Sequence, residues 1–412
     1  MQTRYILQTA FSGLRRNTLR SGLTILGIVI GVAAIILVVS VGKGAQELVL
    51  RQIRGLGSRT IIVEPGREPE GPSSLAEIFT DSLRERDVAA LQKPANVRGV
   101  KRLTPAVFQV ATVSSQNESI RTNVLGAAEA IQNIIGISAQ EGRFFSADEV
   151  RQKSSVAVLG SEVTEKLFGA SRAVGEMIKI KGRTFRVIGI VAPKGRVGVL
   201  DVDNIVAVPY TTSQQYLLGI THFNSIIVEA ESEEVVTDVV QDIKIVLRSL
   251  HGISDPDKDD FHVTTQADIV ERVGTVASIL TILLVSIAAI SLVVGGIGIM
   301  NIMLVSITER TREIGLRKAV GATNRDILVQ FLLEAMLLTV TGGVIGIVLG
   351  AGLAWITSLV LGRITGFDWV FTLPLSAVLL GVSVASVVGL IFGLYPARQA
   401  SLKNPIEALR YE

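Results

Sequence analysis

The sequence has 412 residues, of which 48% are hydrophobic and 5% aromatic, and it carries a formal charge of +3. The apolar residues are concentrated in four blocks, which indicates an integral membrane protein and argues against a large soluble one. The sequence contains no cysteine, which excludes disulfides, thiol catalysis and cysteine-ligated zinc.

The charges are segregated along the chain. Residues 43–272 hold 27 Lys or Arg and 30 Asp or Glu, whereas the remainder holds 13 and 7. The excess of basic residues therefore lies in the short flanks of the apolar blocks, where it marks the cytoplasmic side of a membrane. It does not indicate a nucleic-acid partner.

The N-terminal segment, residues 1–22, places Arg4, Arg15, Arg16 and Arg20 among apolar residues at helical spacing. This pattern predicts an amphipathic helix on the cytoplasmic membrane surface. Residues 23–42 form an uncharged block of 20 residues, which is long enough for a first span. The block is too long for the apolar region of a signal peptide and no Ala-x-Ala site follows it, so we expect it to remain uncleaved.

Two helices are expected to be longer than a membrane requires. Leu48, Val49, Ile53 and Leu56 continue the helical pattern beyond the first span. The second uncharged block, residues 273–308, would form a helix of about 54 Å, against a hydrocarbon core of about 30 Å. These helices are predicted to form a paired stalk that carries the segment between them away from the membrane.

That segment, residues 43–272, is predicted to be a large mixed α/β domain outside the cytoplasm. Expected helices cover residues 81–92, 161–168 and 233–250. Expected strands cover residues 59–64, 97–104, 106–113, 155–159, 177–181, 183–190, 205–209 and 225–229. Residues 67–76 are expected to be a loop, and a second subdomain is expected to be inserted between about 115 and 222.

A charged island, residues 309–326, follows the second span. Eight of its 18 residues are charged and five of these are basic, which predicts a cytoplasmic loop. The island is also patterned as a short helix, with Ile314, Ala319 and Val320 near one side. Gly321 is expected to end this helix before a second start at Thr323. Such a helix between two spans is well placed to take a push from a cytoplasmic partner.

The third and fourth spans are predicted over residues 327–362 and 373–395, with a cytoplasmic tail over 396–412. The loop between them is nearly neutral, so both termini are expected in the cytoplasm. Small residues at four-residue spacing predict close helix packing in lipid. They are Gly27, Gly31, Gly342, Gly346, Gly350, Gly381, Ala385, Gly389 and Gly393.

Candidate chemistry is sparse. No Gly-x-x-x-x-Gly-Lys-Ser/Thr motif and no His-Glu-x-x-His motif occurs, and we expect no catalytic residue, bound cofactor or metal. Asp255, Asp257 and Asp259 match the start of a calcium loop, but Asp260 and Gln266 occupy positions that require Gly and Glu, so a solvated acidic turn is favoured. Glu334, a carboxylate inside a span, is either a proton or substrate site or a bond to a neighbouring helix.

Several motifs resemble the MacB/FtsX-like ABC transporter permeases. They are the segments 14–31, with Leu-Arg-Arg-Asn-Thr-Leu-Arg-Ser-Gly, 306–322, with Arg-Glu-Ile-Gly-Leu-Arg-Lys-Ala-Val-Gly-Ala, 395–400 and 404–410. Gly142-Arg-Phe-Phe145 and Val208-Pro-Tyr-Thr211 are similar to the extracytoplasmic core domain of that family.

The resemblance implies an inner-membrane permease subunit, paired with itself or a homologous permease and driven by a cytoplasmic ABC ATPase that binds the ATP and magnesium. Because this sequence begins directly with the surface segment, we expect the ATPase to be another polypeptide. A periplasmic adaptor is a further partner that the resemblance leaves open, and membrane lipid surrounds the spans. We hypothesise that the island docks on the ATPase through Glu309, Arg310, Arg312, Glu313, Ile314, Gly315, Arg317, Lys318, Gly321 and Ala322.

The function expected from the resemblance is export or extraction of a substrate by movement of the exterior domain. Two alternatives stay open within the family: a non-transporting transducer that activates an extracytoplasmic hydrolase, and a lipoprotein-releasing permease. A membrane anchor without an ATPase is disfavoured, because a plain anchor needs no helical island of 18 residues.

Overall fold

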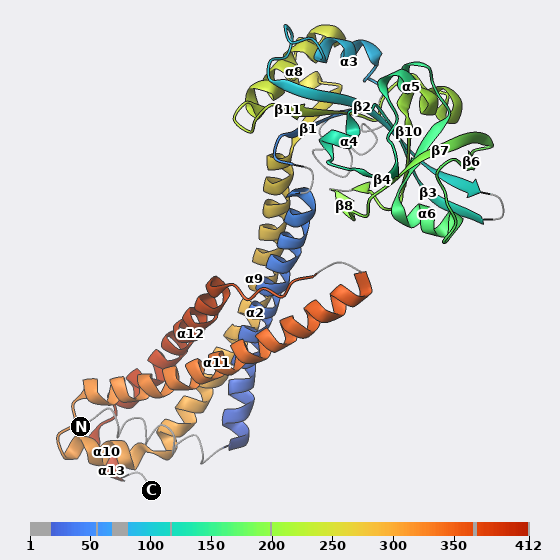
Figure 1. Cartoon of the computed structure of the whole chain (residues 1–412). Helices are drawn as coiled ribbons and strands as arrows, with labels where there is room; N and C mark the ends of the chain where they lie inside the picture. The colour runs from blue at the N-terminus through green and yellow to red at the C-terminus, as the bar shows by residue number, and fades with distance from the viewer. Residues whose placement is uncertain are drawn as a thin grey trace. The chain divides into compact units, whose positions relative to one another are not determined.

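The computed structural model describes residues 18–54, 57–67, 81–115, 118–197, 200–365 and 369–410. Most of the expected surface helix and most of the loop over 67–76 lie outside these residues. The chain divides into two compact units, one formed by Met1–Leu48 with Val273–Glu412 and the other by Val49–Arg272. They are the membrane unit and the α/β domain (Figure 1).

The membrane unit contains four helices that are long and apolar enough to cross a bilayer. They are α2 (Thr18–Arg54), α9 (Gln266–Glu309), α11 (Asn324–Thr365) and α12 (Leu375–Ser401). The helical pattern beyond Gly42 continues as predicted, and the 44 residues of α9 amount to about 66 Å of helix. The predicted end of the fourth helix at Tyr395 is wrong, because α12 continues through Pro396 to Ser401.

Helix α2 is packed against the other three spans. A Cβ atom placed on Gly346 of α11 would lie 2.9 Å from the Val29 carbonyl oxygen, and one on Gly350 would lie 2.7 Å from that of Ala33. The predicted small-residue row on α11 therefore lies directly on the α2 backbone, and Gly342 meets the Ile28 side chain at 3.2 Å in the same way.

The other small residues lie at three further helix contacts. A Cβ placed on Gly27 of α2 would lie 3.1 Å from the Cα of Gly295 on α9, and one on Gly31 would lie 2.6 Å from the Leu292 side chain of the same helix. A Cβ on Gly381 of α12 would lie 3.2 Å from Val32 of α2. Along α12 the remaining members of the row contact α11. They are Ala385 against Gly343, Gly389 against Thr339, and Gly393 against Ala335.

The α/β domain is built on one mixed sheet. Among the described residues ten strands form it, in the order β12-β1-β11-β2-β3-β10-β5-β7-β4, with β6 pairing to β2 and β7. The strands are β1 (Thr60–Pro65), β2 (Val100–Ser115), β3 (Glu118–Ala127), β4 (Ala139–Gly142), β5 (Val156–Leu159), β6 (Met177–Ile180), β7 (Arg183–Val191), β10 (Ile205–Pro209), β11 (Ser225–Ala230) and β12 (Phe261–Thr265). A separate pair is β8 (Arg196–Val197) with β9 (Leu200–Asp201).

Helices cover this sheet. They are α3 (Glu85–Leu91), α4 (Ile131–Ile134), α5 (Ala147–Arg151), α6 (Ser161–Phe168), α7 (Tyr210–Thr212), the π-helix η2 (Ser213–Leu218), α8 (Val236–His251) and the 3-10 turn η3 (Pro256–Lys258). Asp259 belongs to the calcium-loop pattern. Its carboxylate accepts hydrogen bonds from two nitrogens of Arg248, at 2.7 and 2.8 Å, and therefore forms an ion pair with that guanidinium.

The domain has two lobes that share strand β2. The core of the first lobe takes residues up to Val107 and again from Phe223, and the second lobe takes residues between Ala106 and Leu217. Between Leu217 and Phe223 the buried core residues change from those of the second lobe to those of the first. The predicted boundary near 115 is wrong, because β2 runs unbroken from Val100 to Ser115 through both lobes.

Two strand predictions needed correction. The two strands predicted on either side of Pro105 are the single strand β2; its pairing with β3 begins at Ala106–Ala127, so Pro105 lies one residue outside that ladder. Strand β3 was not predicted. Its exposed charged residues, Glu118 and Arg121, obscure the apolar alternation that normally reveals a strand.

Candidate functional site

The charged island folds into a separate short helix, α10 (Thr311–Ala319). Arg310 leaves the helical conformation between α9 and α10, and the Thr311 hydroxyl donates to the Ile307 carbonyl at 2.9 Å. Gly321 has a φ of +112°, which ends α10 where the sequence predicts a stop. Thr323 then caps α11: its hydroxyl oxygen accepts from the Asp326 N–H at 3.2 Å, and its own backbone N–H donates to the Asp326 carboxylate at 2.9 Å.

One face of α10 is buried against the C-terminal helix α13 (Pro405–Arg410). Ile314 is fully buried, and a Cβ placed on Gly315 would lie 2.7 Å from the Ala408 methyl group. Figure 1 shows α10 and α13 side by side within the membrane unit. Gly315 and Ile314 are therefore packing residues of α10. Within the predicted tail over residues 396–412, α13 is helical and packs against α10.

Lys318 fastens α10 to the end of α12. Its ammonium donates to the Ser401 carbonyl at 2.6 Å and to the Lys403 carbonyl at 2.8 Å. A cation is favourable there, because the last carbonyls of a helix lack partners within the helix and carry partial negative charge. Lys318, which the sequence suggested as a docking residue, therefore contacts its own chain.

A second fastening joins Arg310 to Glu334 of α11. The guanidinium lies 3.4 Å from the carboxylate, and the two side chains are only 17% and 11% exposed. Of the two predictions for Glu334, a bond to a neighbouring helix is the one for which the structure provides a partner. A charge pair in such a poorly hydrated position is costly to separate, because each ion would be left buried alone.

The opposite face of α10 is open. Leu316 is 58% exposed and Val320 is 83% exposed, one helical turn apart. They line a hollow of about 410 Å³ together with Arg317, Ala322, Asp326, Ile327 and Gln330. The prediction that Val320 shares a side with Ile314 is wrong, since one is exposed and the other fully buried.

Charged residues surround this apolar pair. Glu309, Arg312 and Glu313 are exposed. Arg317 pairs with Glu313 one turn before it and also donates to Gln330 of α11 at 3.2 Å. Leu316 was not among the predicted docking residues and Val320 was predicted on the buried side, because the prediction relied on charge. The four-residue spacing of these two apolar residues within a charged segment is the sequence signal that could have identified them.

The motif at residues 142–145 has a structural explanation in the second lobe of the α/β domain. Gly142 has a φ of +73°, and a Cβ there would lie 2.2 Å from the Ile188 carbonyl oxygen, so only glycine fits. Arg143 makes a bidentate pair with Glu149 at 2.6 and 2.7 Å. The hydrogen bonds from Arg143 lower the pKa of Glu149 to about 2. This motif anchors α5 to the sheet.

The motif at residues 208–211 ends strand β10 and contributes Tyr210 and Thr211 to the lining of a second cavity. The Tyr210 hydroxyl donates to the Glu85 carboxylate at 3.2 Å, and the Thr211 hydroxyl donates to the Val150 carbonyl. Within the described ranges no three His, Asp or Glu side chains converge as a metal site.

The comparison with known families is decisive. Residues 21–246 match the MacB-like periplasmic core domain, and residues 285–405 match the FtsX-like permease C-terminal domain. The chain belongs to the MacB/FtsX-like family of ABC transporter permeases. The FtsX-like match contains α10, the Arg310–Glu334 ion pair and the Ser401 and Lys403 carbonyls that accept from Lys318.

The relatives include proteins longer than this chain. The chain is 39% identical over 407 residues to the macrolide export ATP-binding/permease protein MacB of Bdellovibrio bacteriovorus, covering 98% of this chain and 61% of that protein. The MacB protein of Chlorobaculum tepidum is 37% identical, also over 98% of this chain and 61% of the relative. A solved periplasmic region of MacB from Actinobacillus actinomycetemcomitans is 24% identical over 55% of this chain and 97% of that chain, with a TM-score of 0.47.

The family assigns both units of the chain. The α/β domain is a periplasmic core domain of MacB type, located between the first and second spans. The chain is a multi-pass inner-membrane protein and an ABC-type transporter permease. It spans 61% of the length of the MacB proteins named above.

Proposed function

We propose that this permease is the membrane subunit of an ABC export complex in which a cytoplasmic ATPase moves α10 and the periplasmic core domain moves in response. The observation that carries the proposal is that one side of α10 is apolar and exposed, whereas the opposite side contacts α11, α13 and the end of α12. Leu316 on α10 and Val320 directly after it are exposed and line the same hollow, and grouped exposed apolar side chains are typical of a protein contact.

The open face has the composition of a docking site. Two apolar side chains can anchor in a partner's pocket, while Glu309, Arg312 and Glu313 surround them as a polar rim. Rim charges at solvent-exposed positions contribute little affinity individually but guide the orientation of the partner. Leu316 and Val320 are therefore expected to contribute most of the binding energy.

The fastened face makes α10 a mechanical lever. Arg310 ties it to α11, Lys318 ties it to the end of α12, and Gly315 packs on α13 without room for a side chain. A displacement of α10 would therefore be shared by α9, α11 and α12 instead of being absorbed by a flexible loop.

The spans suit the transmission of such a displacement. Helix α9 is continuous over 44 residues and contains no proline, the residue that most strongly breaks the hydrogen-bond ladder of a helix. The Gly346 and Gly350 contacts hold α11 against the α2 backbone, so these two helices cannot slide past each other without a steric clash.

We propose the following assembly around this chain. Both termini and α10 lie in the cytoplasm, as the basic flanks indicate. ATP and magnesium bind in the ATPase, a second copy or a homologous permease completes the pair, and a periplasmic adaptor is a further candidate partner. The names of the MacB relatives, which refer to macrolide export, support export as the direction of movement.

The test is purification of the full-length tagged chain from its native membrane, followed by mass spectrometry for a co-purifying ABC ATPase. Replacing Leu316 and Val320 together by Glu should reduce the recovered ATPase by about tenfold, equivalent to about 1.4 kcal/mol, because charged side chains cannot enter an apolar pocket. The control is Ile364→Glu at the opposite end of α11, an equally exposed apolar residue. Equal ATPase recovery for all three proteins would contradict docking through α10.

A further inference from the structure

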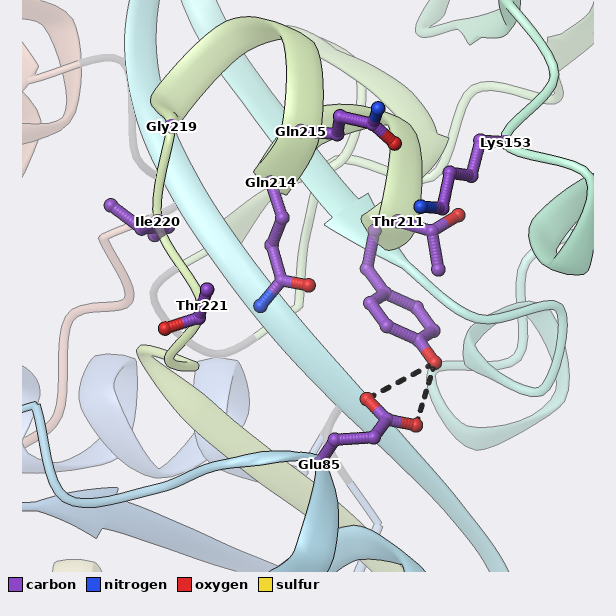
Figure 2. Close-up of a pocket in the computed structure, with 9 residues that line it drawn as sticks. Glu85, Lys153, Thr211, Gln214, Gln215, Gly219, Ile220 and Thr221 are labelled. Carbon is purple, nitrogen blue, oxygen red and sulfur yellow. Dashed lines mark hydrogen bonds between the residues drawn. The ribbon is translucent and has the colours of Figure 1, made fainter.

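A cavity of about 540 Å³ in the α/β domain lies at the junction of the two lobes (Figure 2). Its lining includes Glu85 from the start of α3, Lys153 from the loop after α5, and Tyr210, Thr211 and Gln214 from α7 and η2. The volume falls within the usual range for small-molecule sites. The proposed coupling function uses none of these residues.

One end of the cavity is acidic. The Tyr210 hydroxyl donates to both Glu85 oxygens, at 3.2 and 3.5 Å, and among the described residues it is the one donor to that carboxylate. Burial, together with the negative charge of Glu85, raises the pKa of Tyr210, so the phenol keeps its proton. A carboxylate can accept about four hydrogen bonds, so Glu85 retains capacity for an ammonium group.

The other end is basic. Lys153 has a φ of +55°, a left-handed conformation that costs a non-glycine residue about 1 kcal/mol. The side chain is exposed, and within the part of the chain that the structure describes its ammonium makes no ion pair or hydrogen bond. Figure 2 shows the Lys153 side chain on the Thr211 side of the cavity, away from Glu85.

A further polar group of the lining, Gln214, has unused hydrogen-bonding capacity. Gln214 uses its amide nitrogen to donate to the His222 carbonyl at 2.9 Å, which leaves its amide oxygen as an acceptor. Gln214 belongs to the π-helix η2, and π-helical turns are rare and frequently occur at functional sites. This segment combines a rare backbone form with a side chain oriented by the protein itself.

We propose that this cavity binds a short zwitterionic peptide, with the peptide's ammonium at Glu85, its carboxylate at Lys153 and a backbone N–H donating to Gln214. Opposite charges at opposite ends favour a ligand with opposite charged termini over a neutral sugar or a simple ion. Hydrogen bonds to charged groups are the strong ones, so both termini contribute to recognition.

The test uses the full-length protein in lipid nanodiscs, titrated with triglycine by isothermal calorimetry. We expect saturable binding with a dissociation constant of roughly 0.1–1 mM, as is typical of small polar ligands. N-acetyl-triglycine and triglycine amide, which each lack one terminal charge, should bind about tenfold more weakly. These ligand changes leave the protein untouched, so a folding defect cannot produce them.

Variants assign the two ends. In Glu85→Gln, N-acetylation of the peptide should no longer weaken binding, and in Lys153→Met, amidation should no longer weaken it. In each case the variant already lacks the protein charge with which that terminus of the peptide would pair. Glu165→Gln and Lys179→Met, two exposed positions outside the cavity, are the matched controls. Absence of saturation at about 10 mM, or equal binding of all three ligands to the unmodified protein, would overturn the proposal.

Discussion

Replacing Lys318 by Met tests the fastening of α10 most directly. The substitution keeps the length of the side chain but removes the ammonium that contacts the Ser401 and Lys403 carbonyls at 2.6 and 2.8 Å. Hydrogen bonds from a charged donor typically contribute about 1.5–3 kcal/mol each. Lys318 is half-buried, so water can reach the released carbonyls and replace part of that energy. A total loss of about 1–2 kcal/mol is therefore expected.

This loss should appear as local opening of α13. A change of 1–2 kcal/mol corresponds to an increase of about 5- to 30-fold in the open population. Hydrogen–deuterium exchange of the full-length protein in nanodiscs, read on peptides covering residues 402–410, measures that population. Exchange in the α/β domain should stay unchanged, because the described contacts of Lys318 lie within the membrane unit.

The matched control is Arg312→Met, which removes an exposed charge from the same helix. It should leave exchange in α13 within twofold of the unmodified protein, since single exposed charges contribute little. Lys318→Arg should restore part of the protection. If Lys318→Met and Arg312→Met give the same exchange in α13, the ammonium contacts do not hold α10 to α12, and the lever proposed above loses one of its fastenings.

Three other predictions concern the packing, the periplasmic core domain and the topology. Gly350→Leu should lower the free energy of unfolding by about 3 kcal/mol, since even a Cβ there would lie 2.7 Å from a carbonyl oxygen of α2. The control Val348→Leu, at an exposed position of the same helix, should be neutral in a detergent melting assay, and equal melting temperatures for the two variants would reject the packing. The pKa of Glu149 is lowered from 4.5 to about 2, so its contribution of about 1–2 kcal/mol to the free energy of unfolding is present above pH 4.5 and is lost as the pH falls toward 2. The difference in melting temperature between the unmodified protein and Glu149→Gln should therefore close at low pH, and a difference independent of pH would contradict this. A cysteine at Ser171 should react with an impermeant thiol reagent on intact spheroplasts and one at Thr323 should react only after lysis, and labelling of Thr323 from outside would overturn the topology.

The sequence by itself determined the features that depend on neighbouring residues along the chain. Uncharged runs longer than a bilayer located the spans, and the charge imbalance located the island. Gly321 indicated the end of α10, because a helix stop is decided by the backbone freedom of one residue. The row at Gly342, Gly346 and Gly350 indicated that a helix face packs closely, although not which helix it meets.

Only the tertiary structure decided what each residue of the island contacts. Lys318 and the Ser401 carbonyl are 83 positions apart, and Arg310 and Glu334 are 24 apart, so no local pattern could pair them. The exposure of Val320 depends on where α13 lies, and helical periodicity alone placed it on the wrong side. The cavity between Glu85 and Lys153 likewise exists because the sheet brings together segments that are distant in sequence. Periodicity and hydropathy describe how a segment divides into faces, whereas long-range packing decides which face is covered and by what.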